Sequence, residues 1–482
     1  MKKANLTFFN SLTKQKQEFA PLSGGDTVAM YSCGPTVYNY AHIGNLRAYI
    51  FVDSVRRVLK YNGYKINGVM NITDVGHLTD DGDDGLDKME EQAKKQKKAP
   101  LEIAKQVTDV FFDDLKKLNI ERVEHIAKAT DYINQMLKFI EGLEQRGFAY
   151  KTDDGVYFDT LKLDNYGILS GKKNQDLKAG ARIAINTKKR NAADFALWKL
   201  SEKGRLMEWD SKYGMGYPGW HIECSAIARD FFGDKFDIHT GGIDHIPIHH
   251  ENEIAQSCGI SGGCVPALFW MHNEFMQVDG GKMSKSLGNV YTVSDLEGGK
   301  LGFKVSGGAF RYFCLNTHYR KVLNFTAEGI KGAVTAFDRL IDLLIKHKES
   351  KENNNSEVNG KIENAKTEFL SAINDDLNLP LGLGILWTLL KEPFSVKIFD
   401  AAIQLDNVLG LDLINAKRTE SDLSKTEQTA ECLPAEIAAL LIDRAKARAD
   451  KDFALSDKLR DELANKGYAV IDQKGEQIVS KI

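Results

Sequence analysis

The sequence predicts an α/β protein with a Rossmann-like parallel sheet, an inserted domain and a C-terminal α-helical region. One observation is a strand-like run over residues 26–33, followed by apolar residues near helical spacing from Leu46 to Leu59 and a second strand-like run over Lys65–Thr73. Strand–helix–strand order implies parallel strands in an open sheet. The other observation is that the chain reads as mostly helical from about residue 307 onward.

The elements that follow the first β-α-β unit define the expected domains. The polar stretch that begins near residue 80 indicates an insertion, and we expect the sheet to resume near Phe236. The further elements expected in order are an amphipathic helix around Val110–Leu118, a helix over Asp131–Gln145, a short GVYFDT strand, a strand over Phe236–Thr240, a helix from His249, a strand over Leu268–Val278 and a charged helix over Asp443–Ala464. The expected domains are 1–80 and 220–306 for the two halves of the α/β domain, 81–219 for the connective insertion, 307–347 for a first helical region and 348–482 for a second helical domain.

Composition limits the protein class. The 482 residues are too many for one core, and 43% hydrophobic with 27% charged residues is ordinary for a globular protein. A net charge of −3 does not indicate nucleic-acid binding, so any basic footprint would be a local patch. We expect neither a transmembrane helix nor a signal peptide, and six separated cysteines do not predict a disulfide framework. These features predict a cytoplasmic protein with no membrane partner.

The segment HIGN, His42–Asn45, lies between the first predicted strand and its helix. Ligands of open α/β sheets bind at the carboxyl ends of strands, and a helix N-terminus favours phosphate groups. An imidazole there could donate hydrogen bonds to a phosphoryl group. Four letters alone are equally consistent with an ordinary strand-to-helix turn.

The segment KMSKS, Lys282–Ser286, follows a predicted strand about 240 residues after HIGN. Lys282 and Lys285 among small residues make a cationic loop that could neutralise a triphosphate and release pyrophosphate. Taken alone, the loop could also be a solvated basic surface. The two segments in this order are far more specific than either one.

A third set of residues could bind a metal. Cys33 ends the first strand, Cys224 lies in GWHIECSAIA, and His249 and Glu253 share one helix face because they are four residues apart. Two thiolates, an imidazole and a carboxylate make a plausible zinc set. None of the spacings is a short CxxC pair, and each cysteine alone could be a core residue. His250 is an alternative ligand to His249, because it lies three residues before Glu253 and can also share a helix face with it.

The order of HIGN and KMSKS resembles that of class I aminoacyl-tRNA synthetases, and longer segments resemble cysteinyl-tRNA synthetases. The catalytic segments are CGPTVYNYAHIGN, NITD, NAADFALWK, PGWHIECSA, GGIDHIPIHHENEIAQS and KMSKSLGN. INDDLNLPLGLGILW and KDFALSDKLRDELANKGY resemble the tRNA-binding region. The resemblance implies that 1–80 and 220–306 form the Rossmann catalytic domain, 307–347 a helical stem-contact region and 348–482 a helical anticodon-binding domain. The chain departs from the family at Asn45, where the class signature has a second His, at Tyr217, where Arg is common, and at its C-terminus, which lacks the usual Trp.

The resemblance implies roles for individual residues. The implied zinc ligands, for one ion per chain, are Cys33, Cys224, His249 and Glu253. The implied ATP-binding residues are Gly34, Pro35, Thr36, His42, Gly44, Asn45 and Lys285, with His42, Asn45, Lys282 and Lys285 as catalytic residues and Mg²⁺ accompanying ATP. The implied cysteine pocket contains Thr73, Trp220, His221 and Asp244.

The function implied is ligation of L-cysteine to tRNA(Cys) by a monomer, through cysteinyl adenylate. A hydrophobic pocket separates cysteine from serine or alanine by only about 1–3 kcal/mol, whereas zinc prefers a thiolate to a hydroxyl. Two alternatives stay open: a cysteine ligase acting on a small amine, as in mycothiol synthesis, and a non-catalytic tRNA-binding paralogue. The C-terminal cations expected near the anticodon, or on a merely solvated helix, are Arg444, Lys446, Arg448, Lys451, Lys458 and Arg460.

Overall fold

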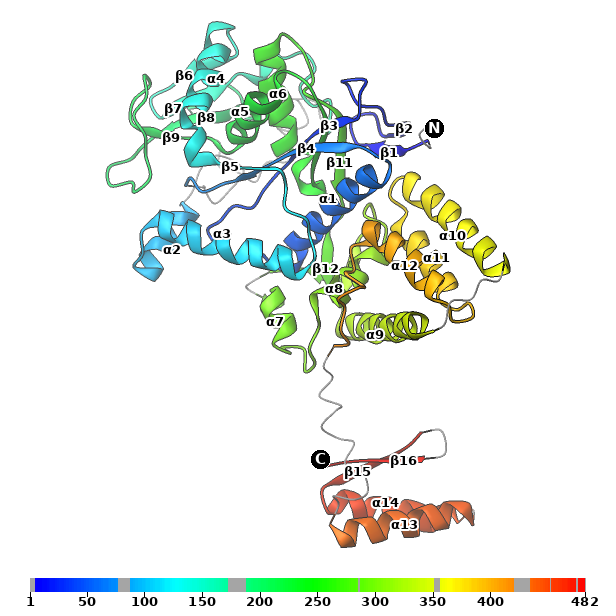
Figure 1. Cartoon of the computed structure of the whole chain (residues 1–482). Helices are drawn as coiled ribbons and strands as arrows, with labels where there is room; N and C mark the ends of the chain where they lie inside the picture. Colours follow the sequence, from blue (N-terminus) through cyan, green and yellow to red (C-terminus); the bar gives the residue numbers. More distant parts are fainter. Residues whose placement is uncertain are drawn as a thin grey trace. The chain divides into compact units, whose positions relative to one another are not determined.

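The computed structural model describes residues 5–76, 87–171, 188–284, 287–350, 356–419, 434–450, 452–473 and 476–481. The chain divides into two compact units (Figure 1). Unit 1 comprises Met1–Asp295 and Ser306–Lys417, and unit 2 comprises Leu296–Val305 and Arg418–Ile482.

A five-stranded parallel sheet forms the centre of unit 1, in the order β11-β10-β3-β4-β5. Its strands are β3 (Thr27–Ser32), β4 (Lys65–Ile72), β5 (His125–Lys128), β10 (Phe236–Gly242) and β11 (Ala267–Asn273). Helix α1 (Ile43–Tyr61) connects β3 to β4, which confirms the predicted β-α-β unit. The chain adds β4 on one side of β3 and β10 on the other. The carboxyl ends of β3 and β10 therefore form a topological switch point, where such sheets bind ligands.

The insertion is not fully separate from this sheet. Strand β5 lies within the 81–219 range expected to form the insertion, yet it pairs with β4 as the fifth strand. The other elements of that range are α2 (Lys88–Gln96), α3 (Pro100–Lys117), α4 (Ile133–Gln145) and an antiparallel sheet of β6 (Ala149–Lys151), β7 (Gly155–Phe158), β8 (Phe195–Leu200) and β9 (Gly216–Pro218). One hydrophobic core contains both Trp198 of this sheet and Trp270 of the central sheet, so the insertion is packed against the catalytic half.

The chain returns from β9 to the central sheet through α5 (Trp220–Phe232), and α6 (His249–Ser261) follows β10. The single strand expected over Leu268–Val278 is wrong, because β11 ends at Asn273 and β12 (Met276–Val278) joins a second sheet with β13 (Gly281–Lys282) and β14 (Leu323–Phe325). Buried Arg47 of α1 lies at the break and donates hydrogen bonds to the carbonyl groups of Glu274 and Phe275. These bonds satisfy backbone groups that a continuous strand would pair.

Helices occupy most of unit 1 after this small sheet. They are α8 (Gly307–Leu315), α9 (Ala327–Glu349), α10 (Ser356–Asn374), α11 (Leu379–Leu389) and α12 (Val396–Leu409), preceded by the short α7 (Val293–Glu297). The N-terminal hairpin of β1 (Thr7–Asn10) and β2 (Gln15–Glu18) also belongs to this unit, and Asp376 accepts a hydrogen bond from the backbone N–H of Phe9 at 2.8 Å. The 348–482 range expected to form one domain thus begins with helices of unit 1.

The described residues of unit 2 from 434 onward form α13 (Ala435–Ala449), α14 (Phe453–Asn465) and an antiparallel hairpin of β15 (Tyr468–Gln473) and β16 (Glu476–Lys481). The single charged helix expected over Asp443–Ala464 is wrong, because Asp450 ends α13 and Asp452 caps α14 by accepting from the Leu455 N–H at 3.0 Å. Arg444 is only 1% exposed, so it packs inside the unit instead of offering its charge to a ligand. Lys451 lies outside the described residues. No helix in the described ranges is long and apolar enough to cross a membrane.

Candidate active site

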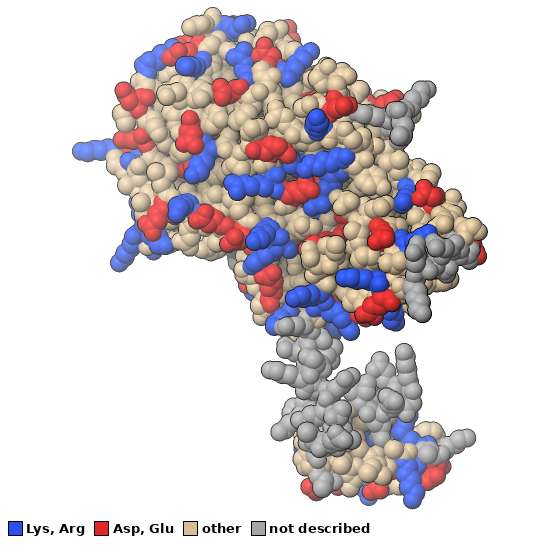
Figure 2. Space-filling model, in the orientation of Figure 1, with Lys and Arg blue, Asp and Glu red and all other residues tan. Residues whose placement is uncertain are grey.

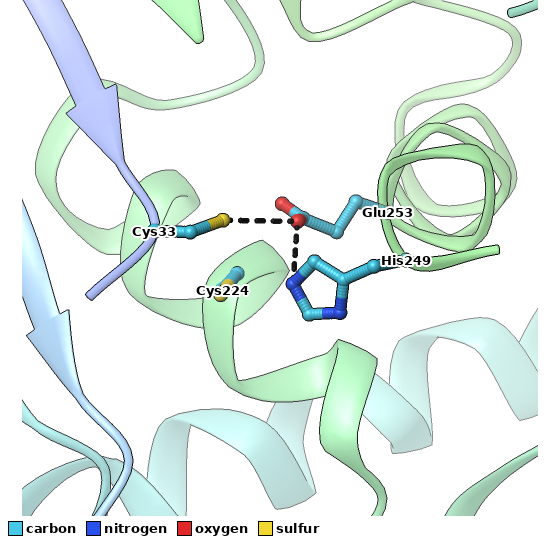
Figure 3. A group of neighbouring side chains, drawn as sticks. All are labelled: Cys33, Cys224, His249 and Glu253. Atoms are coloured by element: carbon cyan, nitrogen blue, oxygen red, sulfur yellow. Dashed lines mark hydrogen bonds and ion pairs between the residues drawn. The ribbon is translucent and has the colours of Figure 1, made fainter. Parts of the chain in front are cut away.

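Cys33 is the first residue after β3 and lies at the switch point. Its backbone N–H donates to the carbonyl oxygen of Thr240 on β10, at 3.4 Å, so the thiol is held between the two neighbouring strand ends. Cys224 comes from α5, while His249 and Glu253 stand one turn apart on α6. Side chains from three segments that are distant in the sequence therefore point toward one spot (Figure 3).

These four side chains fit a metal ion. One donor atom from each of Cys33, Cys224, His249 and Glu253 lies within 4.8 Å of the other three. His249 Nε2 is 3.0 Å from Glu253 Oε1, and Cys33 Sγ is 3.9 Å from the same oxygen. Tetrahedral zinc with bonds of about 2.0–2.3 Å needs donor separations of roughly 3–4 Å, so small shifts would close the set around an ion.

A second set overlaps the first. Cys33 and Glu253 also lie within 4.8 Å of His239 and His250. His239 Nε2 is 2.9 Å from Glu253 Oε2, and His250 Nε2 is 3.3 Å from Cys33 Sγ. The structure therefore leaves both His249 and His250 as candidate metal ligands. His239 was missed from the sequence, although an imidazole within the apolar strand segment FDIHT is the signal that could have found it.

Charge is concentrated in this cluster. A hydrogen bond with Cys33 lowers the pKa of the Cys224 thiol to about 6, against the opposing effect of burial. Burial alone would lower the pKa of His249, but the neighbouring Cys224 and Glu253 raise it to about 10. Burial likewise would raise the pKa of Glu253, yet His239 and His249 hold it well below its usual range. These shifts favour a thiolate at Cys224 and a carboxylate at Glu253 beside a protonated His249, whose proton a dication would displace.

The expected pocket residues differ in their distance from this cluster. The Trp220 ring is 4.6 Å from the His249 ring, and His221 Nδ1 is 3.0 Å from His249 Nδ1. Thr73 is buried, and its hydroxyl donates to Glu223 at 2.7 Å. Asp244 lies exposed in the turn after β10. Trp220 and His221 thus adjoin the cluster directly, whereas Asp244 lies at the rim.

His42 caps α1, the helix that begins within the HIGN segment. Its Nδ1 accepts from the Asn45 backbone N–H at 3.2 Å, and Asn45 Oδ1 accepts from the His42 N–H at 3.2 Å. This reciprocal capping box explains why an Asn serves at position 45. Because Nδ1 is an acceptor, neutral His42 carries its proton on Nε2 and can donate from there.

The GPT segment, Gly34–Thr36, runs beside the end of β4. The Gly34 N–H donates to Asn71 Oδ1 at 2.8 Å, and the Thr73 N–H donates to the Pro35 carbonyl at 3.1 Å. A Cβ on Gly34 would stand 1.6 Å from the Asn71 carbonyl oxygen, so only glycine allows this close approach.

The HIGN segment lies close to the KMSKS segment. A Cβ on Gly44 would lie 3.3 Å from the Met283 methyl group and 3.1 Å from the His42 ring. The Ile43 N–H also donates to the Tyr291 carbonyl at 2.9 Å, just beyond the KMSKS loop. Lys282 is exposed beside this contact, whereas Lys285 lies outside the described residues. Lys282 and Met283 thus lie near the N-terminus of α1, and a helix N-terminus favours phosphate groups.

Comparison with known proteins identifies related sequences and a shared fold. A family model for the class I (C) tRNA synthetase catalytic domain matches residues 19–335, and one for the cysteinyl-tRNA ligase anticodon-binding domain matches residues 431–479. The chain is 42% identical to cysteine–tRNA ligase 1 of Burkholderia lata, over 97% of this chain and 95% of that protein. It is 40% identical to the cysteine–tRNA ligase of Treponema denticola, over 99% of this chain and all of that protein. The structure of Mycobacterium tuberculosis methionyl-tRNA synthetase shares the fold, with a TM-score of 0.56 at 14% identity over 89% of this chain and 96% of that chain.

Proposed function

The chain belongs to the cysteine–tRNA ligase family of class I aminoacyl-tRNA synthetases, and on that premise we propose how it selects cysteine and activates it. It activates L-cysteine with ATP and transfers the cysteinyl group to the 3′ end of tRNA(Cys). Selection depends on a zinc ion held by Cys33, Cys224, His249 and Glu253. The observation that carries the proposal is the meeting of these four donor groups at the sheet's switch point.

The donor set has the chemistry that selection of a thiol needs. Zinc bound there would favour the cysteine thiolate over the hydroxyl of serine. His221 contacts His249 on the nitrogen opposite the one facing Glu253, so it orients the imidazole. The Trp220 ring packs against the same imidazole and would form one wall of the cysteine pocket.

The residues proposed to bind ATP neutralise charge and position the reacting groups. The carboxylate of cysteine attacks the α-phosphorus of ATP, and pyrophosphate leaves. His42 Nε2–H, at the positive end of α1, would donate to the phosphate oxygens as charge develops, with Lys282, Lys285 and Mg²⁺ neutralising the leaving group. A terminal ribose hydroxyl of the tRNA then attacks the carbonyl carbon of cysteinyl adenylate and releases AMP. Positioning is sufficient for both steps, so no protein nucleophile is required.

The match of residues 431–479 to an anticodon-binding domain supports tRNA over a small amine as acceptor. The decisive experiment is ATP–pyrophosphate exchange with cysteine, serine and alanine, followed by charging of purified tRNA(Cys). We expect exchange with cysteine alone, and charging of the tRNA. Exchange without charging would support the amine ligase, and no exchange would support the non-catalytic paralogue. Light scattering would check the expected monomer.

A further inference from the structure

The small sheet β13-β12-β14 has one buried face and one open face. Met276, Val278, Leu323 and Phe325 are at most 7% exposed and form its buried face. The alternate positions in register, Gln277, Lys282 and Asn324, turn to the other side. Lys282 and Asn324 are exposed, and Gln277 is half-buried. The KMSKS segment begins at Lys282 in β13, so this open face lies beside the segment proposed to bind ATP.

Two apolar side chains extend the open face. Phe275 is 52% exposed and Val322 is 46% exposed, and they precede the registered pair Met276 and Leu323 on adjacent parallel strands. Their equivalent positions place them side by side on the face that Gln277 and Asn324 share. A solvent-exposed phenylalanine beside amides and a lysine is unusual for a soluble surface and typical of single-stranded nucleic-acid platforms.

The open face formed by Phe275, Val322, Gln277 and Asn324 is called the platform below. Hydrogen bonds hold its backbone in place. The Leu323 N–H donates to the Phe275 carbonyl at 3.0 Å. Arg47, 3% exposed, donates to the carbonyls of Glu274 at 2.8 Å and Lys321 at 2.5 Å, and also to that of Phe275. Arg47 belongs to α1, the helix that His42 caps. The position of the platform is therefore coupled to that of the phosphate-binding helix end.

A polar groove of about 680 Å³ adjoins the platform at Lys321. Its cations are Lys16, Arg320 and Lys321, with Asp375 as the acid among its lining residues. Arg320 is held by two contacts of 2.7 and 2.8 Å to buried Asp376, and Lys16 by one of 2.6 Å to Asp375. These two pairs leave Lys321 as the cation that gives the groove its positive charge, while Glu274 and Asp279 add acid charge near the platform. On the face drawn in Figure 2 the two signs are interspersed, so a local groove of this kind is where a polyanion would find complementary charge.

We propose that this platform and groove bind the acceptor arm of the tRNA substrate. An unpaired base near the 3′ end stacks on Phe275 with Val322 beside it, while Lys321 and Lys16 contact backbone phosphates. This inference rests on the proposed function, since it names the surface that presents the tRNA end to the adenylate. An aromatic ring holds any base, because every base has a π face, and the flanking cations fix the direction of the strand.

The first test uses the full chain with Phe275→Ala, Phe275→Leu and Phe275→Trp. Alanine and leucine should each raise the KM for tRNA(Cys) about ten-fold, within the range of base–aromatic stacking, and tryptophan should restore it. Cysteine-dependent pyrophosphate exchange should stay unchanged in all three. Phe394→Ala removes a phenylalanine of similar exposure, 47%, from the helical region and should leave the KM unchanged.

The second test uses Lys321→Ala, with Lys366→Ala on α10 as the matched control. Loss of one phosphate contact should reduce the salt slope of log K for tRNA by about 0.7–0.9, and the control should not change it. If the wild type shows normal pyrophosphate exchange and charging, but Phe275→Ala has an unchanged KM for tRNA(Cys), the platform inference is overturned and the proposed function stands. Restoration by leucine would overturn the stacking role. A wild type without exchange would instead refute the proposed function.

Discussion

The perturbation most sharply defined by the structure is Arg311→Met. Arg311 is fully buried on α8 and donates to Asp53 of α1, to the Leu409 carbonyl at the end of α12 at 2.8 Å, and to the Leu118 carbonyl at 3.1 Å. Asp53 is also fully buried and accepts from Arg57 at 2.6 Å and from the Glu121 N–H at 2.9 Å. The guanidinium group therefore links the helix that begins at His42 to two other helices of unit 1.

Methionine fills much of the volume but leaves Asp53 with one cation fewer and several carbonyls without their donor. Breaking a buried ion pair by removing one partner costs about 3–5 kcal/mol. Because Asp53 keeps two of its hydrogen bonds, we expect the lower end, about 3 kcal/mol at pH 7.

The penalty should depend on pH. Burial would raise the pKa of Asp53, but Arg311 and Arg57 hold it below its ordinary value. A depressed carboxyl pKa contributes stability above the unfolded pKa, and that contribution is lost as pH falls through the folded pKa. In the variant the pKa rises and protonation relieves the unpaired charge. The gap between variant and wild type should therefore be smaller at pH 4 than at pH 7.

Urea unfolding followed by tryptophan fluorescence measures this in unit 1. All five tryptophans lie in that unit: Trp198, Trp209, Trp220, Trp270 and Trp387. The control Arg229→Met removes an exposed ion pair with Asp234, 2.8 Å long, and should change stability by less than about 1 kcal/mol. If Arg311→Met is no more destabilising than the control, or if its penalty is the same at both pH values, the ion-pair reasoning is refuted.

Three further predictions concern the function. Purified protein should contain about one zinc per chain, and Cys224→Ser should lose the metal while His250→Gln retains it; equal loss in both, by elemental analysis, would favour the second donor set. Lys285→Ala should lower pyrophosphate exchange strongly with an unchanged melting curve, because a loop lysine adds little to a core; normal exchange would make the loop a surface feature. Removal of residues after 417 should leave exchange nearly intact and raise the tRNA KM severely, as charging assays would show, and a truncated chain that charges tRNA normally contradicts the anticodon role.

The truncation point shows how the structure revised a sequence-based boundary. A polar stretch near residue 350 suggested that a separate domain begins there. Helices α10–α12 instead belong to unit 1, and Asp376 between α10 and α11 binds Phe9, Tyr319 and Arg320. A polar linker looks the same whether the next helices separate or fold back, because their packing depends on distant partners.

The sequence by itself determined whatever depends on neighbouring residues. The β-α-β unit, the HIGN and KMSKS segments and the pairing of His249 with Glu253 follow from short-range spacing, because helix and strand periods are local properties. The meeting of Cys33, Cys224 and α6 depended on the order of strands in the sheet, which no local pattern specifies. Only the tertiary structure brought His239 and His250 to the same carboxylate, and only it showed Phe275 exposed beside Val322, because exposure is decided by which elements cover a face.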